Sequence, residues 1–95
     1  MPSVSLVIPC FNGGGFLDAT LRSVSQQDFP DFECLVVDDF SSDDSLSIAK
    51  AWRARDCRIR IITQRARSGV SAARNAGLRA AGGALCAFLD ADDLL

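Results

Sequence analysis

Three carboxylates that could bind a metal ion lie close together in the sequence, at Asp90, Asp92 and Asp93. They follow a short apolar run, residues 84–89, whose length and flanking glycines are typical of a buried strand. While the chain stays extended, Asp90 and Asp92 point to the same side. Carboxylates this close repel each other unless a cation or protons lie between them, and their oxygens suit Mg²⁺ or Mn²⁺. The alternative is a solvated acidic turn, because Asp is a common turn residue.

Composition allows one small folded domain and excludes some classes of protein. The chain has 95 residues, 48% of them apolar, and a net charge of −2, which argues against disorder and against a nucleic-acid-binding module. Most basic residues are arginines between Arg53 and Arg79, whereas carboxylates cluster at 38–44 and 90–93. Such an arginine-rich segment could hold an anionic ligand beside a metal, but for most of these arginines we favour a solvated charged face.

The cysteines predict neither a zinc site nor a disulfide framework. They form no Cys-x-x-Cys pair, and the sequence has no histidine. Cys34 and Cys86 lie within apolar segments and are expected to be buried small hydrophobic residues. We therefore expect a reducing compartment and a cytoplasmic location, at the inner face of the membrane if a longer parent protein carries an anchor. No signal peptide is expected, and the apolar runs are too short to span a bilayer.

Strands and helices are expected to alternate along the chain. The predicted strands are residues 4–8, 32–37, 58–62 and 84–89, and the predicted helices are residues 16–28, one that follows 41–44, and 70–81. Pro9 is expected to end the first strand, because proline lacks the N–H that a central ladder needs. The third strand alternates in polarity and is expected at an edge of the sheet.

Apolar spacing and turn residues indicate where the helices pack. Leu17, Leu21 and Val24 share one helical face, and residues 45–52 place Ser45, Ile48, Ala49 and Trp52 on another. Residues 41–44 supply an N-cap and acidic first-turn residues for the second helix. Gly77 allows the third helix to pack closely on a sheet.

The order β-α-β-α-β-α-β predicts an α/β fold, a Rossmann-like three-layer sandwich around a mostly parallel four-stranded sheet. In such sheets ligands bind outside the carboxyl ends of the strands. Polar residues follow three of the predicted strands, at 9–12, at Asp38-Asp39 and at 90–93. Because these strand ends meet at one edge, we expect these groups to form one site.

The candidate ligand is a nucleoside diphosphate. The sequence has no P-loop, and the glycines at 13–15 do not complete the Gly-x-Gly-x-x-Gly pattern, although Asp38 lies about where its acidic partner would. A divalent cation at Asp90 and Asp92 could supply the charge that a diphosphate needs. Asp39 could accept a hydrogen bond from a base or a ribose hydroxyl, and Phe11 could pack on a base.

Four segments resemble the family 2 glycosyltransferases in order and spacing. They are residues 4–12 (VSLVIPCFN), 35–41 (LVVDDFS), 69–77 (GVSAARNAG) and 88–93 (FLDADD). The resemblance covers nearly the whole chain. It implies the GT-A fold, a nucleotide-sugar donor that is most often a UDP-sugar, and a Mg²⁺ or Mn²⁺ ion.

The resemblance also implies roles for single residues. The residues placed at the nucleotide are Pro9, Phe11, Asn12, Asp39, Arg74 and Asp90, with Asp39 on the uracil and Asp90 near the ribose or sugar. The metal is placed on Asp92, with Asp90 beside it. Structural alternatives remain: Asn12 can simply shape its loop, Asp38 can cap a turn, and Arg74 can pair with a surface carboxylate.

Two positions depart from the family pattern. Members usually have Tyr where this chain has Phe11, so stacking is kept but a hydroxyl hydrogen bond is lost. Members often have a small residue where this chain has Phe40, so the turn after Asp39 is expected to differ.

The family's acceptor-binding half and catalytic base come later in its sequence. An inverting transfer needs a general base for the acceptor hydroxyl, and the metal stabilises the leaving group. No base can be assigned in this chain. We therefore expect residues 1–95 to be the donor-binding subdomain of a truncated glycosyltransferase, inactive alone, whose acceptor would be a saccharide or a lipid-linked saccharide.

Two other interpretations stay open. The apolar fourth strand would normally be covered on both faces, so we expect exposed apolar surface and self-association as a homodimer, through that surface or an open sheet edge. The chain could then be a structural fragment. A phosphoacceptor receiver domain also places acidic residues around Mg²⁺, but Lys50, the only lysine, lies in the middle of a predicted helix.

Overall fold

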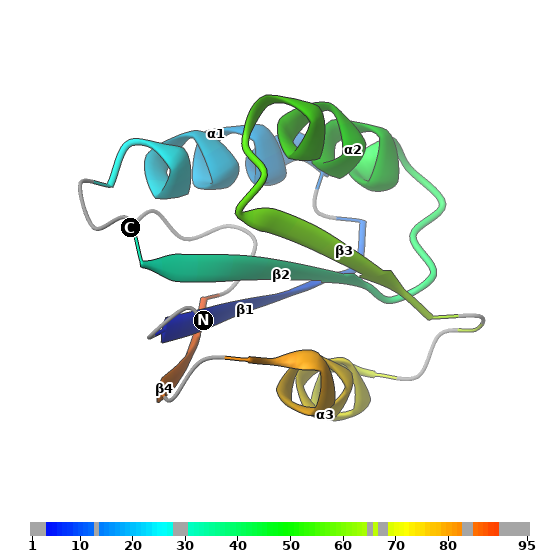
Figure 1. Cartoon of the computed structure of the whole chain (residues 1–95). Coiled ribbons are helices and arrows are strands. Elements are labelled where there is room, and N and C mark those ends of the chain that lie inside the picture. Colours follow the sequence, from blue (N-terminus) through cyan, green and yellow to red (C-terminus); the bar gives the residue numbers. More distant parts are fainter. Residues whose placement is uncertain are drawn as a thin grey trace.

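The computed structural model describes residues 4–12, 14–27, 31–64, 66, 69–82 and 85–89. Its elements are β1 (Val4–Cys10), α1 (Gly14–Ser25), β2 (Phe32–Asp38), α2 (Ser45–Arg55), β3 (Ile59–Thr63), α3 (Val70–Ala80) and β4 (Leu85–Phe88). The strands form one sheet in the order β3-β2-β1-β4, and every pair is parallel. Helices α1 and α2 cover one face and α3 covers the other (Figure 1). The predicted three-layer α/β fold is confirmed, and β3 is an edge strand as expected.

The core fills the space on both sides of the sheet, because successive residues of a strand point to opposite faces. Beneath α1 and α2, the strands contribute buried Leu6, Ile8, Cys10, Cys34, Val36 and Ile59. Beneath α3 lie Val7, Leu35 and Val37, and Ala73 of α3 belongs to the same buried cluster. The predicted helix faces are confirmed: Leu17, Leu21, Val24, Ser45, Ala49 and Trp52 are buried, and Ile48 packs against the core. Periodicity therefore identified the buried side of each helix.

Helix α3 approaches the sheet closely at Gly77. A Cβ atom there would overlap Val7 Cγ1 and would lie 3.2 Å from Val7 Cγ2 and 3.3 Å from Val37 Cγ2. Both valines are fully buried and lie in the two central strands. The close packing predicted from this glycine is confirmed.

The predicted end of the first strand is wrong, because β1 continues through Pro9 to Cys10. Alternate residues of a strand direct their backbone groups to the same neighbour. The Val7 carbonyl accepts from Leu89 N at 3.0 Å, so Val7 and Pro9 both face β4. The β1–β4 register stops at Val7↔Phe88, before the proline's missing N–H is needed. Pairing with β2 uses the other residues of β1 and continues to Cys10↔Asp38.

The two cysteines predicted to be buried differ. Cys34, in the central strand β2, is buried, and burial is the main reason that its thiol pKa rises to about 12, with the Asp56 charge adding to it. Cys86 is exposed, so that prediction is wrong. Strand β4 pairs only with β1 among the described strands, and Ala87 and Phe88 beside Cys86 are exposed as well. An apolar sequence alone does not show how much of a strand is covered.

The cap of α2 also differs from the prediction. Asp44 occupies the N-cap position, but its side chain makes no capping hydrogen bond, and the first turn holds no acidic residue. Asp43 acts instead: its Oδ1 accepts from Ser45 N at 3.0 Å and from the Ser45 hydroxyl at 2.5 Å. A short Asp43–Ser45 turn therefore leads into the helix.

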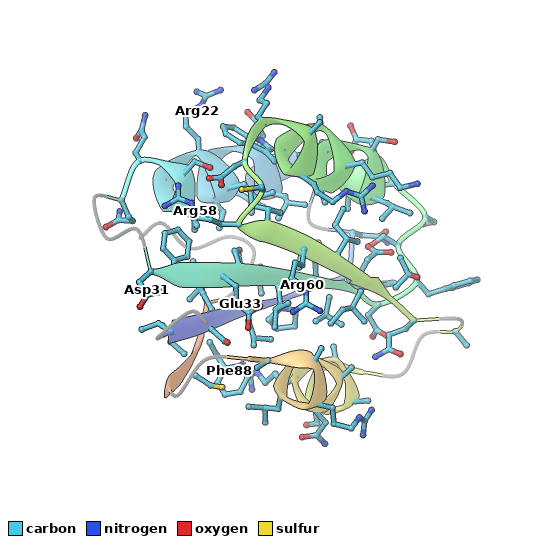
Figure 2. The ribbon with its side chains drawn as sticks, in the orientation of Figure 1. Arg22, Asp31, Glu33, Arg58, Arg60 and Phe88 are labelled. Atoms are coloured by element: carbon cyan, nitrogen blue, oxygen red, sulfur yellow. The ribbon has the colours of Figure 1, made fainter. Side chains whose placement is uncertain are left out.

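Arginines of the basic segment have structural partners. Arg58 pairs with Asp56 at 2.8 Å and lies over the Phe32 ring, 4.4 Å from its centroid. The hydrogen bonds from Arg58 lower the pKa of the Asp56 carboxyl to about 2, although partial burial opposes them. Arg60 of β3 pairs with Glu33 of β2 at 2.9 Å (Figure 2). These two arginines therefore have structural partners within the sheet region, and the solvated face expected for most of the others stays a prediction.

Within the ranges that the structure describes, no helix is long and apolar enough to cross a bilayer.

Candidate functional site

The candidate site lies at the carboxyl ends of β1, β2 and β3. These strands are parallel, and the register aligns Cys10 with Asp38 and Asp38 with Thr63, so the three strands end side by side. Asn12 is the second residue after β1, and Asp39 follows β2 directly. The sequence placed these residues at one edge, and the structure brings them together.

The segments after β1 and β2 are joined at two points. Asp39 N donates to the Cys10 carbonyl at 2.8 Å, which continues the ladder by one step. Two residues further on, Asn12 N donates to Ser41 Oγ at 2.9 Å. Residues 10–12 and 39–41 therefore run side by side.

Asn12 holds the loop that leads into α2. Its φ of 51° is left-handed, a conformation that Asn tolerates better than most residues. Its Oδ1 accepts from Ser42 N at 2.8 Å, from Asp43 N at 3.3 Å and from the Ser42 hydroxyl at 3.4 Å. The loop-shaping alternative for Asn12 is thus observed, while its contact with a nucleotide stays a prediction.

Asp39 ties the same loop to the third helix. The residue is only 1% exposed, and its Oδ2 accepts from Gly69 N at 2.8 Å. Gly69 is the N-cap of α3 and has a φ of 94°, which favours glycine. A carboxylate near a helix N-terminus is also stabilised by the helix dipole. Asp39 is consequently fixed in place before any ligand arrives.

Asp38, the last residue of β2, is buried as well. It is 4% exposed, and its Oδ2 accepts from Ser41 N at 3.3 Å, which is the turn-capping role considered for it. Its Oδ1 has no hydrogen-bond partner among the described residues. One buried acceptor therefore remains at this edge.

Aromatic rings are exposed on both joined segments. Phe11 is 44% and Phe40 57% exposed, whereas Pro9 before them is buried. Phe40 has a left-handed φ of 61°, a conformation that costs a residue with a Cβ about 1–2 kcal/mol. The sequence suggested an altered turn here, and the structure shows a bulky side chain where glycine is favoured.

Arg74 lies on α3 close to the end of β4. Its guanidinium carbon is 5.6 Å from the centroid of the Phe88 ring, a cation–π geometry. Phe88 is the last residue of β4 and is labelled in Figure 2. A positive charge thus lies at the last residue of β4, two residues before Asp90 in the sequence.

The predicted metal ligands Asp90 and Asp92, together with Asp93, lie outside the described residues. Leu89 is the last described residue before them, and its N–H donates to the Val7 carbonyl at 3.0 Å, so Leu89 itself still lies beside β1. Among the described side chains, no group of three or more His, Cys, Asp or Glu residues is placed to hold a metal ion. The metal site stays a prediction based on carboxylate chemistry.

Gly69 and the serines at 41 and 42 were not predicted to shape the site. A glycine just before a helix and serines just after two aspartates are weak signals, since both are common in ordinary loops. Their partners are about 30 residues away in the sequence, which local patterns do not show.

Comparison with known proteins identifies relatives of the whole chain. The model of the family "Glycosyl transferase family 2" matches residues 5–95. The chain is 40% identical over 93 residues to the uncharacterized glycosyltransferase EpsJ of Bacillus subtilis, covering 98% of this chain and 27% of EpsJ. It is 38% identical over 96 residues to the GalNAc(5)-diNAcBac-PP-undecaprenol beta-1,3-glucosyltransferase of Campylobacter jejuni, covering 100% of this chain and 31% of that protein.

Solved glycosyltransferases have the same fold. TarS 1-349 of S. aureus, crystallised with UDP, superposes with a TM-score of 0.91 at 33% identity over 99% of this chain and 28% of TarS. The mannosyltransferase PcManGT of Pyrobaculum calidifontis, in complex with GDP-Man and Mn²⁺, gives 0.91 at 29% identity over 98% of this chain and 28% of that protein. The chain spans less than a third of each of these relatives. By its sequence and by its GT-A fold, the chain belongs to glycosyltransferase family 2.

Proposed function

We propose that the chain binds the nucleotide-sugar donor of a glycosyltransferase, with a UDP-sugar as the donor. The observation that carries this proposal is the joined pair of segments at the carboxyl edge, which holds Asp39, Phe11 and Asn12 together. Nucleotide complexes of structural neighbours support it, since TarS was solved with UDP and with UDP-GlcNAc.

The base is bound by the first two loops of the site. The Asp39 carboxylate accepts a hydrogen bond from the imide N–H of uracil. The hydrogen bond from Gly69 N holds Asp39 in position for this contact. Phe11 offers its exposed ring to the face of the base, and Pro9 borders it from the strand end. Asn12 acts beside them by holding its loop.

Phosphate charge is balanced by a divalent metal and by Arg74. Asp90 and Asp92 would hold Mn²⁺ or Mg²⁺, and this ion would supply positive charge to neutralise the diphosphate as the leaving group. Arg74, placed near the end of β4, supplies a fixed positive charge on the same side. The Mn²⁺ in the PcManGT complex supports this choice of ion.

The reaction we propose is transfer of the sugar to an acceptor hydroxyl with inversion at the anomeric carbon. We assign donor binding to residues 1–95 and assign no general base among them, so turnover by these residues alone is not expected. A saccharide or lipid-linked saccharide acceptor is supported by the undecaprenol-linked substrate in the name of the Campylobacter relative. Family membership favours this function over a phosphoacceptor receiver. A cytoplasmic location stays a prediction.

Calorimetric titration of UDP into the protein, with and without Mn²⁺, tests the proposal. We expect binding only with the metal and at least a hundredfold weaker binding in Asp92→Ala, because one metal ligand is lost. Asp44→Ala is the matched control, since it removes an exposed carboxylate that makes no capping bond. Metal-independent binding, or equal losses in both variants, would contradict the assigned metal site.

Self-association is a second proposal, supported by the exposed residues of β4. Cys86, Ala87 and Phe88 are exposed on a strand that pairs only with β1 in the described sheet. A second copy could pair with this edge or cover its apolar surface. We expect light scattering to give a mass that rises toward a dimer with concentration. A monomer mass at all concentrations would refute it.

A further inference from the structure

Phe40 combines an unfavourable backbone conformation with a side chain that is mostly exposed. Its backbone is left-handed, where glycine is the favoured residue, and 57% of its surface is exposed, so burial gives little in return. Strain of this kind persists where the surroundings hold a residue in place, and it is concentrated at functional sites.

The surroundings of Phe40 do hold it. Asp39 before it is bonded to the Cys10 carbonyl and to Gly69 N. Ser41 after it accepts from Asn12 N and donates its own N–H to Asp38 Oδ2. Phe40 is therefore fixed from both sides and presented to solvent.

The same bonds bring the backbone segment that carries Phe40 next to the segment that carries Phe11. One bond joins residues 10 and 39, the other joins residues 12 and 41, and each phenylalanine is the middle residue of its segment. Both rings are exposed, at 44% and 57%. They lie on adjacent backbone segments, one of which also carries the buried Asp39.

We propose that Phe40 is a base-contacting residue, which together with Phe11 forms one aromatic surface for the base of the donor nucleotide. The inference rests on the proposed function and adds a residue to it. Aromatic rings bind the faces of bases by stacking, which tolerates different bases because each has a π-face. A second ring compensates for the hydroxyl that Phe11 lacks, while Asp39 reads the edge of the base.

The test compares three variants of the protein with two probes, UDP and inorganic pyrophosphate, both titrated with Mn²⁺. Phe40→Gly removes the ring and relieves the backbone, so the fold is retained and thermal stability does not fall. We expect UDP to bind about tenfold more weakly, in line with the loss of one stacked ring, and pyrophosphate to bind unchanged. Phe40→Trp keeps an aromatic face and should keep UDP affinity. Leu78→Ala is the control, since it shortens a side chain that is 43% exposed on α3.

Each outcome has a separate meaning. Equal UDP affinity in Phe40→Gly and the unaltered protein overturns the role of Phe40 and leaves the proposed function standing. Equal losses for UDP and pyrophosphate also overturn it, because the effect would not pass through the base. An unaltered protein that binds pyrophosphate but not UDP, or neither, overturns the proposed function and the role of Phe40 with it.

Discussion

Gly77→Val is expected to lower the free energy of unfolding by about 3 kcal/mol or more, the range of severe overpacking in a core. Even the first added carbon overlaps Val7 Cγ1, and the next contacts, 3.2 and 3.3 Å away, are also valine methyl groups. These methyl groups cannot yield, because Val7 and Val37 are fully buried in the two central strands. Helix α3 would have to move away from the sheet, and it carries Arg74 and the N-cap Gly69.

Urea denaturation of matched variants checks this prediction. Asn75→Val is the control on the same helix, because Asn75 is exposed and its loss should change stability by a few tenths of a kcal/mol. Gly77→Ala should be destabilising too, although alanine favours a helix by about 1 kcal/mol over glycine. Adding Val7→Ala should restore part of that loss, since the overlapping methyl groups are removed. Similar midpoints for Gly77→Val and Asn75→Val would show that α3 does not pack as described.

Much of the fold could be predicted because its signals are local. The spacing of Leu17, Leu21 and Val24 shows the buried face of α1, and short apolar runs show the strands. The alternation of strands and helices then leaves a parallel sheet as the simple solution. Pro9 was misjudged because its effect depends on which neighbour its backbone faces, and Cys86 because exposure depends on what covers the strand.

The location of the site could be predicted from the sequence, but the contacts of its side chains could not. Asp39 and Asn12 follow strand ends, and parallel strands bring such ends to one edge. What these side chains bind within the protein depends on partners about 30 residues away, namely Ser42 for Asn12 and Gly69 for Asp39. No local sequence pattern shows contacts between residues this far apart in the sequence. Glu33 shows the same limit, because it looks like a polar interruption in an apolar strand.

Glu33 is expected to make the folding stability of the protein depend on pH. It lies buried in β2, where its Oε2 accepts from Ser5 Oγ at 2.6 Å and from Gly82 N, and its Oε1 accepts from Arg60. Burial would raise the pKa of this carboxyl, but the hydrogen bonds from Ser5, Gly82 and Arg60 outweigh it, so the pKa is lower than its ordinary value of 4.5. The folded state therefore favours the ionised form.

The sign of the pH dependence follows directly. A carboxyl whose pKa is lowered by folding contributes stability above its unfolded pKa, and this contribution is lost as the pH falls through the folded pKa. The ion pair with Arg60 contributes little to this stability, because the Arg60 side chain is 51% exposed and solvent screens the pair. The buried bond from Ser5 and the partly buried bond from Gly82 account for most of the lowering of the Glu33 pKa.

Glu33→Gln is the matched variant, because it keeps the shape and one acceptor oxygen but cannot ionise. We expect it to be about 1–3 kcal/mol less stable at pH 7, the usual range for hydrogen bonds to a charged group. The difference should shrink from pH 6 to pH 3, as Glu33 itself becomes protonated, and other carboxyls such as Asp56 cancel because both proteins carry them. Urea denaturation at each pH measures it, and a difference that stays constant with pH would contradict the role of the charge. Glu33 also holds Gly82, which lies three residues before β4 in the sequence, and β4 in turn precedes Asp90 of the proposed metal site.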